Sequence, residues 1–244
     1  MPDQADLEQE VHLWYLPTAR FDDEHHLARA AERLSSDEQD RARRFAFEKD
    51  RRSYIAAHWL LRSALSQYLP VEPSAWEFTR SLFGKPAISG PPQGRRIAFN
   101  LSHSPGMVAC AVTKTGEVGV DVETVRPREF LKLAERFFAP GEFQELKRLP
   151  EHERARAFFR FWTLKEAYVK ARGRGLSLDL SGFFFPDVLG NEIRIEFDEG
   201  WDDDPNDWQF YRHEPDDQNQ IASAVHKARC KNVVWRVFSE IPTG

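Results

Sequence analysis

The stretch MVACAVTKTGEVGVDVE, residues 107–123, contains two apolar runs separated by the turn-forming residues KTGE. This pattern predicts two strands joined as a hairpin. The first run is repeated later in the chain, because MVACAVTK at 107–114 resembles QIASAVHK at 220–227 position by position. Each copy ends a series of predicted helices and strands, and a further strand-like segment, 232–238, follows the second copy. We therefore expect two related α+β halves in one chain.

The repeat also predicts where a ligand would bind. We expect the halves to span residues 1–115 and 116–244 in a pseudo-twofold arrangement, with a cleft between them. Ligands bind preferentially in clefts of this kind. With 244 residues, of which 41% are hydrophobic, the chain can bury a substantial core.

Composition excludes several classes of protein. A formal net charge of -5 does not fit a general nucleic-acid binder, although 34 lysines and arginines allow a local anion site. No apolar run approaches the length of a membrane span, and the start MPDQADLEQE lacks the basic and apolar regions of a signal peptide. We expect a cytoplasmic protein that binds neither nucleic acid nor membrane.

Two acids interrupt the strand VGVDVE at 118–123. Because strand side chains alternate, the three valines share one face, and Asp121 and Glu123 share the other with Gly119. Carboxylates held this close repel each other, and one of them binds a proton unless a cation lies between them. A strand with a solvated polar face has the same pattern, so the pair alone leaves both interpretations open.

The segment FFRFWTLKEAYVKARGRGL at 158–176 predicts a helix with one apolar face. That face consists of Phe158, Phe161, Leu164, Tyr168 and Ala171. Glu166 and Lys170 are one turn apart on another face, where an ordinary surface ion pair contributes only about 0.2–0.5 kcal/mol. Asp121, Glu123 and Glu166 thus lie on separate elements that can converge.

Four segments in this order, FGKPAI (83–88), FNLSHS (99–104), GVDVE (119–123) and FWTLKEAYVKARGRGLSL (161–178), resemble the signature motifs of the 4′-phosphopantetheinyl transferases. The resemblance is strongest to the long branch with two halves in one chain, typified by the surfactin-synthetase activator, and it covers residues 41–180. It implies transfer of the phosphopantetheine arm of coenzyme A to a serine of an apo acyl or peptidyl carrier protein, with release of adenosine 3′,5′-bisphosphate.

The resemblance also implies roles for the acids. Asp121 and Glu123 match the family's ligands for Mg²⁺, or Mn²⁺ in its place, and Glu166 would be a third carboxylate. Mg²⁺ prefers such hard oxygen ligands. Glu166 can also be the base toward the carrier serine, and Lys170 matches a lysine near the reacting phosphate. The implied catalytic groups are Glu166, Lys170 and His103.

Coenzyme A contacts are implied mainly in the first half. Lys85 matches a phosphate-contacting lysine, and His103, with Ser102 beside it, matches a histidine on the pyrophosphate. Four arginines lie where the family carries contacts to the 3′-phosphate end, and Arg41 and Arg52 are the preferred candidates; the four are Arg41, Arg44, Arg51 and Arg52. The second half would then hold the metal and the catalytic residues.

Two other functions remain open at this stage: a metal-dependent nucleotide pyrophosphate hydrolase and a coenzyme A-binding module without turnover. Two halves that supply one cleft favour a monomer. The segment 126–143 is either a docking groove for the carrier protein, with Phe137 and Phe138 exposed, or part of the core.

Overall fold

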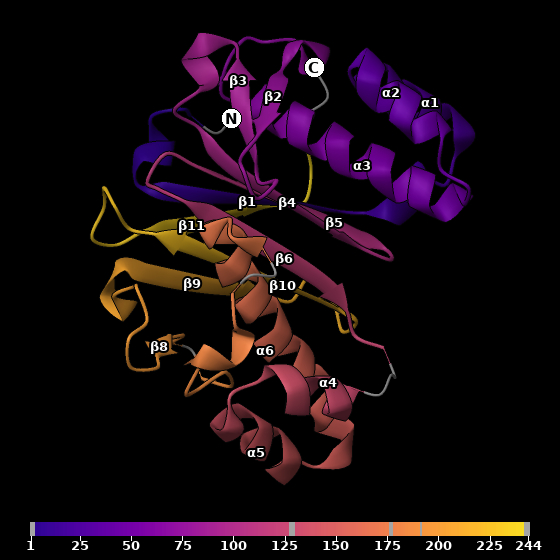
Figure 1. Ribbon diagram of the computed structural model, residues 1–244. Helices are drawn as coiled ribbons and strands as arrows, with labels where there is room; N and C mark the ends of the chain where they lie inside the picture. Colours follow the sequence, from indigo (N-terminus) through magenta and orange to yellow (C-terminus); the bar gives the residue numbers. More distant parts are fainter. Residues whose placement is uncertain (1–2, 127–129, 176–177, 191, 242–244) are drawn as a thin grey trace.

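The molecule has a layered α+β architecture, in which two sheets pack face to face and a long helix covers the outer side of each (Figure 1). The computed structural model describes residues 3–126, 130–175, 178–190 and 192–241. Up to residue 113 the elements are β1 (Glu10–Pro17), α1 (Glu24–Glu32), α2 (Ser36–Arg43), α3 (Glu48–Leu65), β2 (Glu77–Arg80), β3 (Pro86–Gly90), β4 (Ala98–Ser104) and β5 (Met107–Thr113). From residue 118 they are β6 (Val118–Thr124), α4 (Phe130–Phe137), α5 (Pro140–Arg148), α6 (Glu151–Arg172), β7 (Phe183–Phe184), β8 (Glu196–Phe197), β9 (Trp208–His213), β10 (Asn219–His226) and β11 (Val234–Phe238).

In both main sheets, a central strand lies between two strands that precede it in the same half. The first is β11-β1-β5-β4 and the second is β6-β10-β9. β5 pairs antiparallel with β1 and β4, just as β10 pairs antiparallel with β6 and β9. The central strands are the two copies of the sequence repeat, so the expectation of two related α+β halves is confirmed. β11 then returns to pair in parallel with β1 of the first half (Figure 1).

The predicted hairpin at 107–123 is wrong. β5 already has a partner along each edge, and β6 pairs with β10 in the other sheet. Residues 114–117 therefore carry the chain from one sheet to the other. The physical reason is that β5 is a central strand, which leaves no free edge for its neighbour in sequence.

Three apolar cores hold the layers together. One lies between α3 and the first sheet, a second surrounds α6 against the second sheet, and a third lies between the two sheets. Val118, Val120 and Val122 belong to the third core and are at most 1% exposed. The opposite face of β6 therefore points toward α6, as the strand alternation predicted.

Side chains join the two sheets where β4 runs beside β6. The Val120 N–H donates to Asn100 Oδ1 at 2.9 Å, and the Val122 N–H donates to Ser102 Oγ at 3.3 Å. Backbone groups of β6 are thus satisfied by polar side chains of β4 instead of by a continuous ladder. This arrangement brings Ser102 to the face of β6 that carries Asp121.

Gly119 allows α6 to lie directly on β6. A Cβ atom at this position would lie 2.0 Å from the carbonyl oxygen of Ala167 and 2.5 Å from the nitrogen of Ala171, which are backbone atoms of the helix. The predicted apolar face of α6 is buried, and the helix ends at Gly173, whose left-handed φ of 65° favours glycine. Close packing of this helix on this strand sets the depth at which Glu166 meets Asp121.

The aromatic residues of 126–143 pack inward where they are described. Phe138 is 3% exposed and stacks on Phe158, and the half-buried Phe137 meets the edge of Trp162. Residues 127–129 lie outside the described residues. Between the two interpretations of this segment, the structure favours core packing.

Among the described residues, no helix combines the length and apolarity that crossing a bilayer requires.

Replacing Gly119 with alanine tests the contact between β6 and α6. We expect Gly119→Ala to lower the free energy of unfolding by about 1–3 kcal/mol, because the new methyl group overlaps helix backbone that cannot rotate away. Urea denaturation measures the change. Gly141→Ala is the matched control, since a Cβ there meets nothing within 4 Å. Equal stability of the two variants would contradict this packing.

Candidate active site

Three elements meet at the carboxylate of Asp121. Lys170 Nζ on α6 donates to Asp121 Oδ1 at 2.5 Å and to Ser102 Oγ on β4 at 2.8 Å. The Ser102 hydroxyl in turn donates to Asp121 Oδ1 at 3.0 Å. Asp121 is 5% exposed, so the structure holds a buried carboxylate at the junction of the two halves.

The second oxygen of Asp121 has no hydrogen-bond partner in the part of the chain that the structure describes. Asp121 Oδ2 is buried and receives no donor from the described residues. Leaving a charged oxygen dry and unpaired is costly, so such an atom indicates a site for a cation or for a bound donor. Glu123, half-buried, follows on the same face of β6. Carboxylate oxygens are the donors that a hard divalent cation prefers, although the ligand oxygens of Asp121, Glu123 and Glu166 do not all lie within 4.8 Å of one another in the described residues.

Glu166 faces the same junction from α6. Burial and then repulsion by Asp121 raise the pKa of Glu166, and Lys170 only partly offsets this effect. A carboxyl group with a raised pKa is a better proton acceptor than an ordinary glutamate. The structure therefore places a carboxylate of increased basicity beside a lysine and a buried aspartate.

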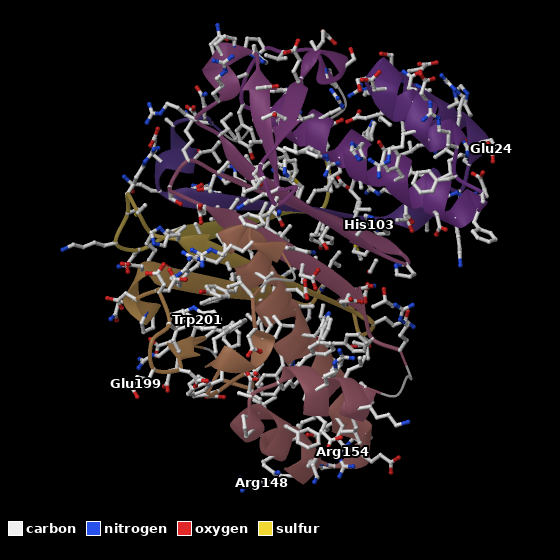
Figure 2. All side chains as sticks on the ribbon, viewed as in Figure 1. Glu24, His103, Arg148, Arg154, Glu199 and Trp201 are labelled. Atoms are coloured by element: carbon white, nitrogen blue, oxygen red, sulfur yellow. The ribbon has the colours of Figure 1, made fainter. Side chains whose placement is uncertain are left out.

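A continuous crevice leads to this junction. A pocket of about 300 Å³ lies between the halves, with Lys85 and Asn100 on one wall and Glu166 and Lys170 on the other. It adjoins a cleft of about 750 Å³ in the first half, and Leu101 lines both. Figure 2 shows His103, which also lines the larger cleft, at the boundary between the halves.

Lys85 and His103 carry cationic groups whose charge is weakened by their surroundings. Burial lowers the pKa of Lys85 to about 8, although Glu117 partly opposes this effect, and Lys85 Nζ donates to the carbonyl oxygen of Ala171 at 2.5 Å. Partial burial and then repulsion by Lys170 lower the pKa of His103. An anionic ligand would raise both pKa values and so favour the protonated forms of these side chains.

The arginines proposed to contact the 3′-phosphate lie in different places. Arg41 lines the larger cleft, with its guanidinium 5.6 Å from the centroid of the Tyr54 ring. Arg52 is not among the residues lining either pocket, and it donates to Asp22 at 2.7 Å. Arg80, which the sequence interpretation missed, also lines the cleft. Its position on the strand before the FGKP motif is the signal that identifies it.

A buried network forms the floor of the larger cleft. Glu38 Oε1 lies 2.8 Å from His58 Nδ1, and Arg62 Nε donates to Glu38 Oε2 at 2.7 Å. Burial opposes ionisation of Glu38, but these hydrogen bonds outweigh it and lower the pKa of Glu38 to about 2. Glu38 also completes the capping box with Ser35 at the start of α2. Arg62 is thereby paired with a carboxylate, which leaves Arg41 and Arg80 as the arginines available to a ligand among the described residues of this cleft.

Comparisons with known proteins agree with this geometry. A model of the 4′-phosphopantetheinyl transferase superfamily matches residues 117–228, and a model described as 4′-phosphopantetheinyl transferase, N-terminal, matches residues 22–115. The chain is 43% identical over 177 residues to the 4′-phosphopantetheinyl transferase HetI of Nostoc sp., covering 72% of this chain and 74% of that protein. It is 32% identical over 163 residues to the 4′-phosphopantetheinyl transferase Sfp of Bacillus subtilis, covering 67% and 70%.

The motifs that surround the crevice lie within the two matched regions. FGKPAI and FNLSHS supply Lys85, Ser102 and His103 from the first region, and GVDVE and FWTLKEAYVK supply Asp121 and the α6 residues from the second. The chain belongs to the 4′-phosphopantetheinyl transferase superfamily, of the long type with two halves in one polypeptide.

Proposed function

We propose that this phosphopantetheinyl transferase requires Mg²⁺, or Mn²⁺ in its place, to move the 4′-phosphopantetheine arm of coenzyme A onto a serine of an apo acyl or peptidyl carrier protein. The observation that carries the proposal is the buried Asp121, which has one oxygen without a partner and lies beside Glu166 and Lys170. Because one chain supplies both walls of the crevice, we further propose that the enzyme acts as a monomer. We also propose that it acts in the cytoplasm.

Asp121, Glu123 and Glu166 would hold the metal. A divalent cation bound there would neutralise charge on the pyrophosphate of coenzyme A. The dry, unpaired oxygen of Asp121 supports this assignment, because an ionised carboxylate with a free lone pair accepts a cation readily. In this proposal the second half, from residue 116, supplies the metal ligands and the catalytic groups.

The first half, up to residue 115, would bind the phosphates of coenzyme A. Lys85, Ser102 and His103 border the junction and would contact the pyrophosphate. Arg41 and Arg80 lie farther out in the larger cleft, where they would hold the 3′-phosphate. Guanidinium groups suit this task because they donate two parallel hydrogen bonds to a phosphate.

The chemistry follows from these positions. The serine oxygen of the carrier forms a bond to the phosphorus that bears pantetheine, and the bond from that phosphorus to the bridging oxygen breaks. Glu166 accepts the serine proton as a general base. Adenosine 3′,5′-bisphosphate leaves, and Lys170 and His103 stabilise the charge that develops on the phosphates.

One experiment separates transfer from the other two functions. The protein is incubated with coenzyme A, Mg²⁺ and a panel of apo carrier domains, and the products are weighed by mass spectrometry. Transfer adds one phosphopantetheine to a carrier serine. Release of 4′-phosphopantetheine without modified carrier would identify a hydrolase, and unchanged coenzyme A bound to the protein would identify a binding module.

Asp121→Asn tests the metal site. The amide oxygen can still accept from Ser102 and Lys170, so we expect the fold to remain while the transfer rate falls by about 10²–10³, the range for losing one preorganised electrostatic group. Transfer rates at saturating Mg²⁺ and urea denaturation provide the two measurements. Asp40→Asn, on an exposed residue paired with Arg43, is the control. Near-normal turnover in Asp121→Asn would remove this residue from the metal site.

Glu166→Gln separates a base from a ligand. Loss of a base lowers the rate by about 10²–10⁴ with unchanged metal affinity, whereas loss of a ligand weakens metal binding and excess Mg²⁺ restores the rate. We expect weaker metal binding and a residual defect at saturation, because this carboxylate lies between the other acid and the open crevice. Measurements of Mg²⁺ binding and of turnover over a range of Mg²⁺ concentrations distinguish the two roles. Full rescue excludes the base, and unaltered metal affinity excludes the ligand.

Arg41→Gln and Arg80→Gln test the 3′-phosphate site. The wild type should bind coenzyme A more tightly than dephospho-coenzyme A by about 1.5–3 kcal/mol, the range for hydrogen bonds to charged groups. The difference should shrink in each variant, as measured by calorimetry. Arg52→Gln tests the other arginine that the sequence favoured, and we expect it to keep the difference because Arg52 is paired with Asp22. If the difference in affinity shrank in Arg52→Gln alone, the 3′-phosphate would bind near Arg52 and not in the larger cleft.

A further inference from the structure

A second cavity of about 700 Å³ lies near the end of α6 and shares Lys85 and Pro86 with the pocket between the halves. Both halves line it, near the starts of β4 and β6. Its basic residues are Lys85, Arg95, Arg96, Lys114, Arg172, His226 and Arg229. Glu117 is the one carboxylate among the described residues that line it. In a chain of net charge -5, this rear cavity is a local concentration of positive charge.

One of these cations, Lys114, is buried in the cavity wall, and Arg172 is partly buried there. Lys114 is 9% exposed, and its Nζ lies 3.9 Å from Glu8 Oε1, which is too far for a hydrogen bond. Arg172 Nη1 donates to Asp203, but Arg172 Nε is buried without a partner among the described residues. Because this nitrogen is inaccessible to solvent, Arg172 would act on an anion in the cavity through its charge and not through that N–H.

Two exposed arginines face the cavity from opposite halves. Arg95 Nε donates to the carbonyl oxygen of Ser89 at 2.8 Å, and Arg229 Nη1 donates to the carbonyl oxygen of Lys114 at 3.2 Å. Neither forms an ion pair with a described carboxylate, so their charges remain available. Planar guanidinium groups on both sides of a cavity favour a phosphate group between them.

Lys85 belongs to both compartments. It lines the pocket beside Glu166 and also the rear cavity, while its Nζ donates to the last turn of α6. A single lysine cannot direct its three donors fully at phosphates on both sides. An anion at the rear would therefore compete for the lysine on which the front pocket depends.

We propose that the rear cavity binds a small phosphate-bearing anion, and that the bound anion lowers the affinity for coenzyme A by engaging Lys85. The volume suits a small molecule, because ligand pockets typically span about 300–1,000 Å³. The proposal that an anion binds rests only on the rear cavity and its basic residues. The effect on coenzyme A rests on the proposed function.

Calorimetry with inorganic pyrophosphate in the absence of metal tests the binding claim. The double variant Arg95→Gln/Arg229→Gln should bind pyrophosphate about tenfold more weakly than the wild type. Arg41→Gln/Arg80→Gln, which also removes two exposed charges but from the front cleft, should retain a site of nearly wild-type affinity. ATP as a second probe distinguishes the ligand source: tighter binding than pyrophosphate indicates a nucleotide, and equal or weaker binding indicates free phosphates. Unchanged pyrophosphate affinity in the rear variant overturns the proposal.

A competition experiment tests the effect on coenzyme A. Without pyrophosphate, the rear variant should bind coenzyme A as the wild type does. Pyrophosphate should raise the Kd for coenzyme A in the wild type and have a much smaller effect in the rear variant. Equal competition in both proteins would place pyrophosphate in the front pocket and reject the rear site. Failure of the proposed function would instead appear as absent carrier modification while rear-site binding persists.

Discussion

The hydrogen-bonded contact among Lys170, Asp121 and Ser102 is the constraint on which the site depends, because each residue comes from a different element. Asp121 is buried, so its charge requires a close cationic partner. Lys170 provides that partner from α6, and Ser102 ties both to β4 of the other half. Displacing α6 would leave the buried carboxylate of Asp121 without its cationic partner, and displacing β4 would remove the hydroxyl that donates to it.

The position of α6 is determined from two sides. Gly119 lets the helix backbone rest on β6, where any side chain would collide with it. On the opposite side, Lys165 is fully buried and donates to the carbonyl oxygens of Leu180 and Phe183 while it pairs with Glu142. The helix that carries Glu166 and Lys170 therefore has little freedom to shift. Catalysis depends on precise placement of the charged groups, so a helix with little freedom to shift favours it.

Charges of opposite sign face each other where the two halves meet. The first half supplies cations to the crevice through Arg41, Arg80 and Lys85, whereas the second half supplies Asp121 and Glu166. Where β4 runs beside β6, the halves meet through side chains of β4 and not through a continuous ladder of backbone hydrogen bonds. That discontinuity leaves a crevice open at the boundary, with basic groups on one wall and acids on the other.

The sequence by itself determined the local features of this protein. Alternation in VGVDVE placed Asp121 and Glu123 on one face, the spacing in α6 identified its core side, and the repeated octapeptide revealed two halves. Each of these depends on backbone periodicity, which is readable over a few residues. Only the tertiary structure decided that β5 and β6 separate into different sheets, that Arg41 and Arg80 line the cleft while Arg52 pairs with Asp22, and that Asp121 keeps an unpaired oxygen. These outcomes depend on strand edges, ion pairs and burial contributed by segments far apart in the chain, and no local pattern encodes such contacts.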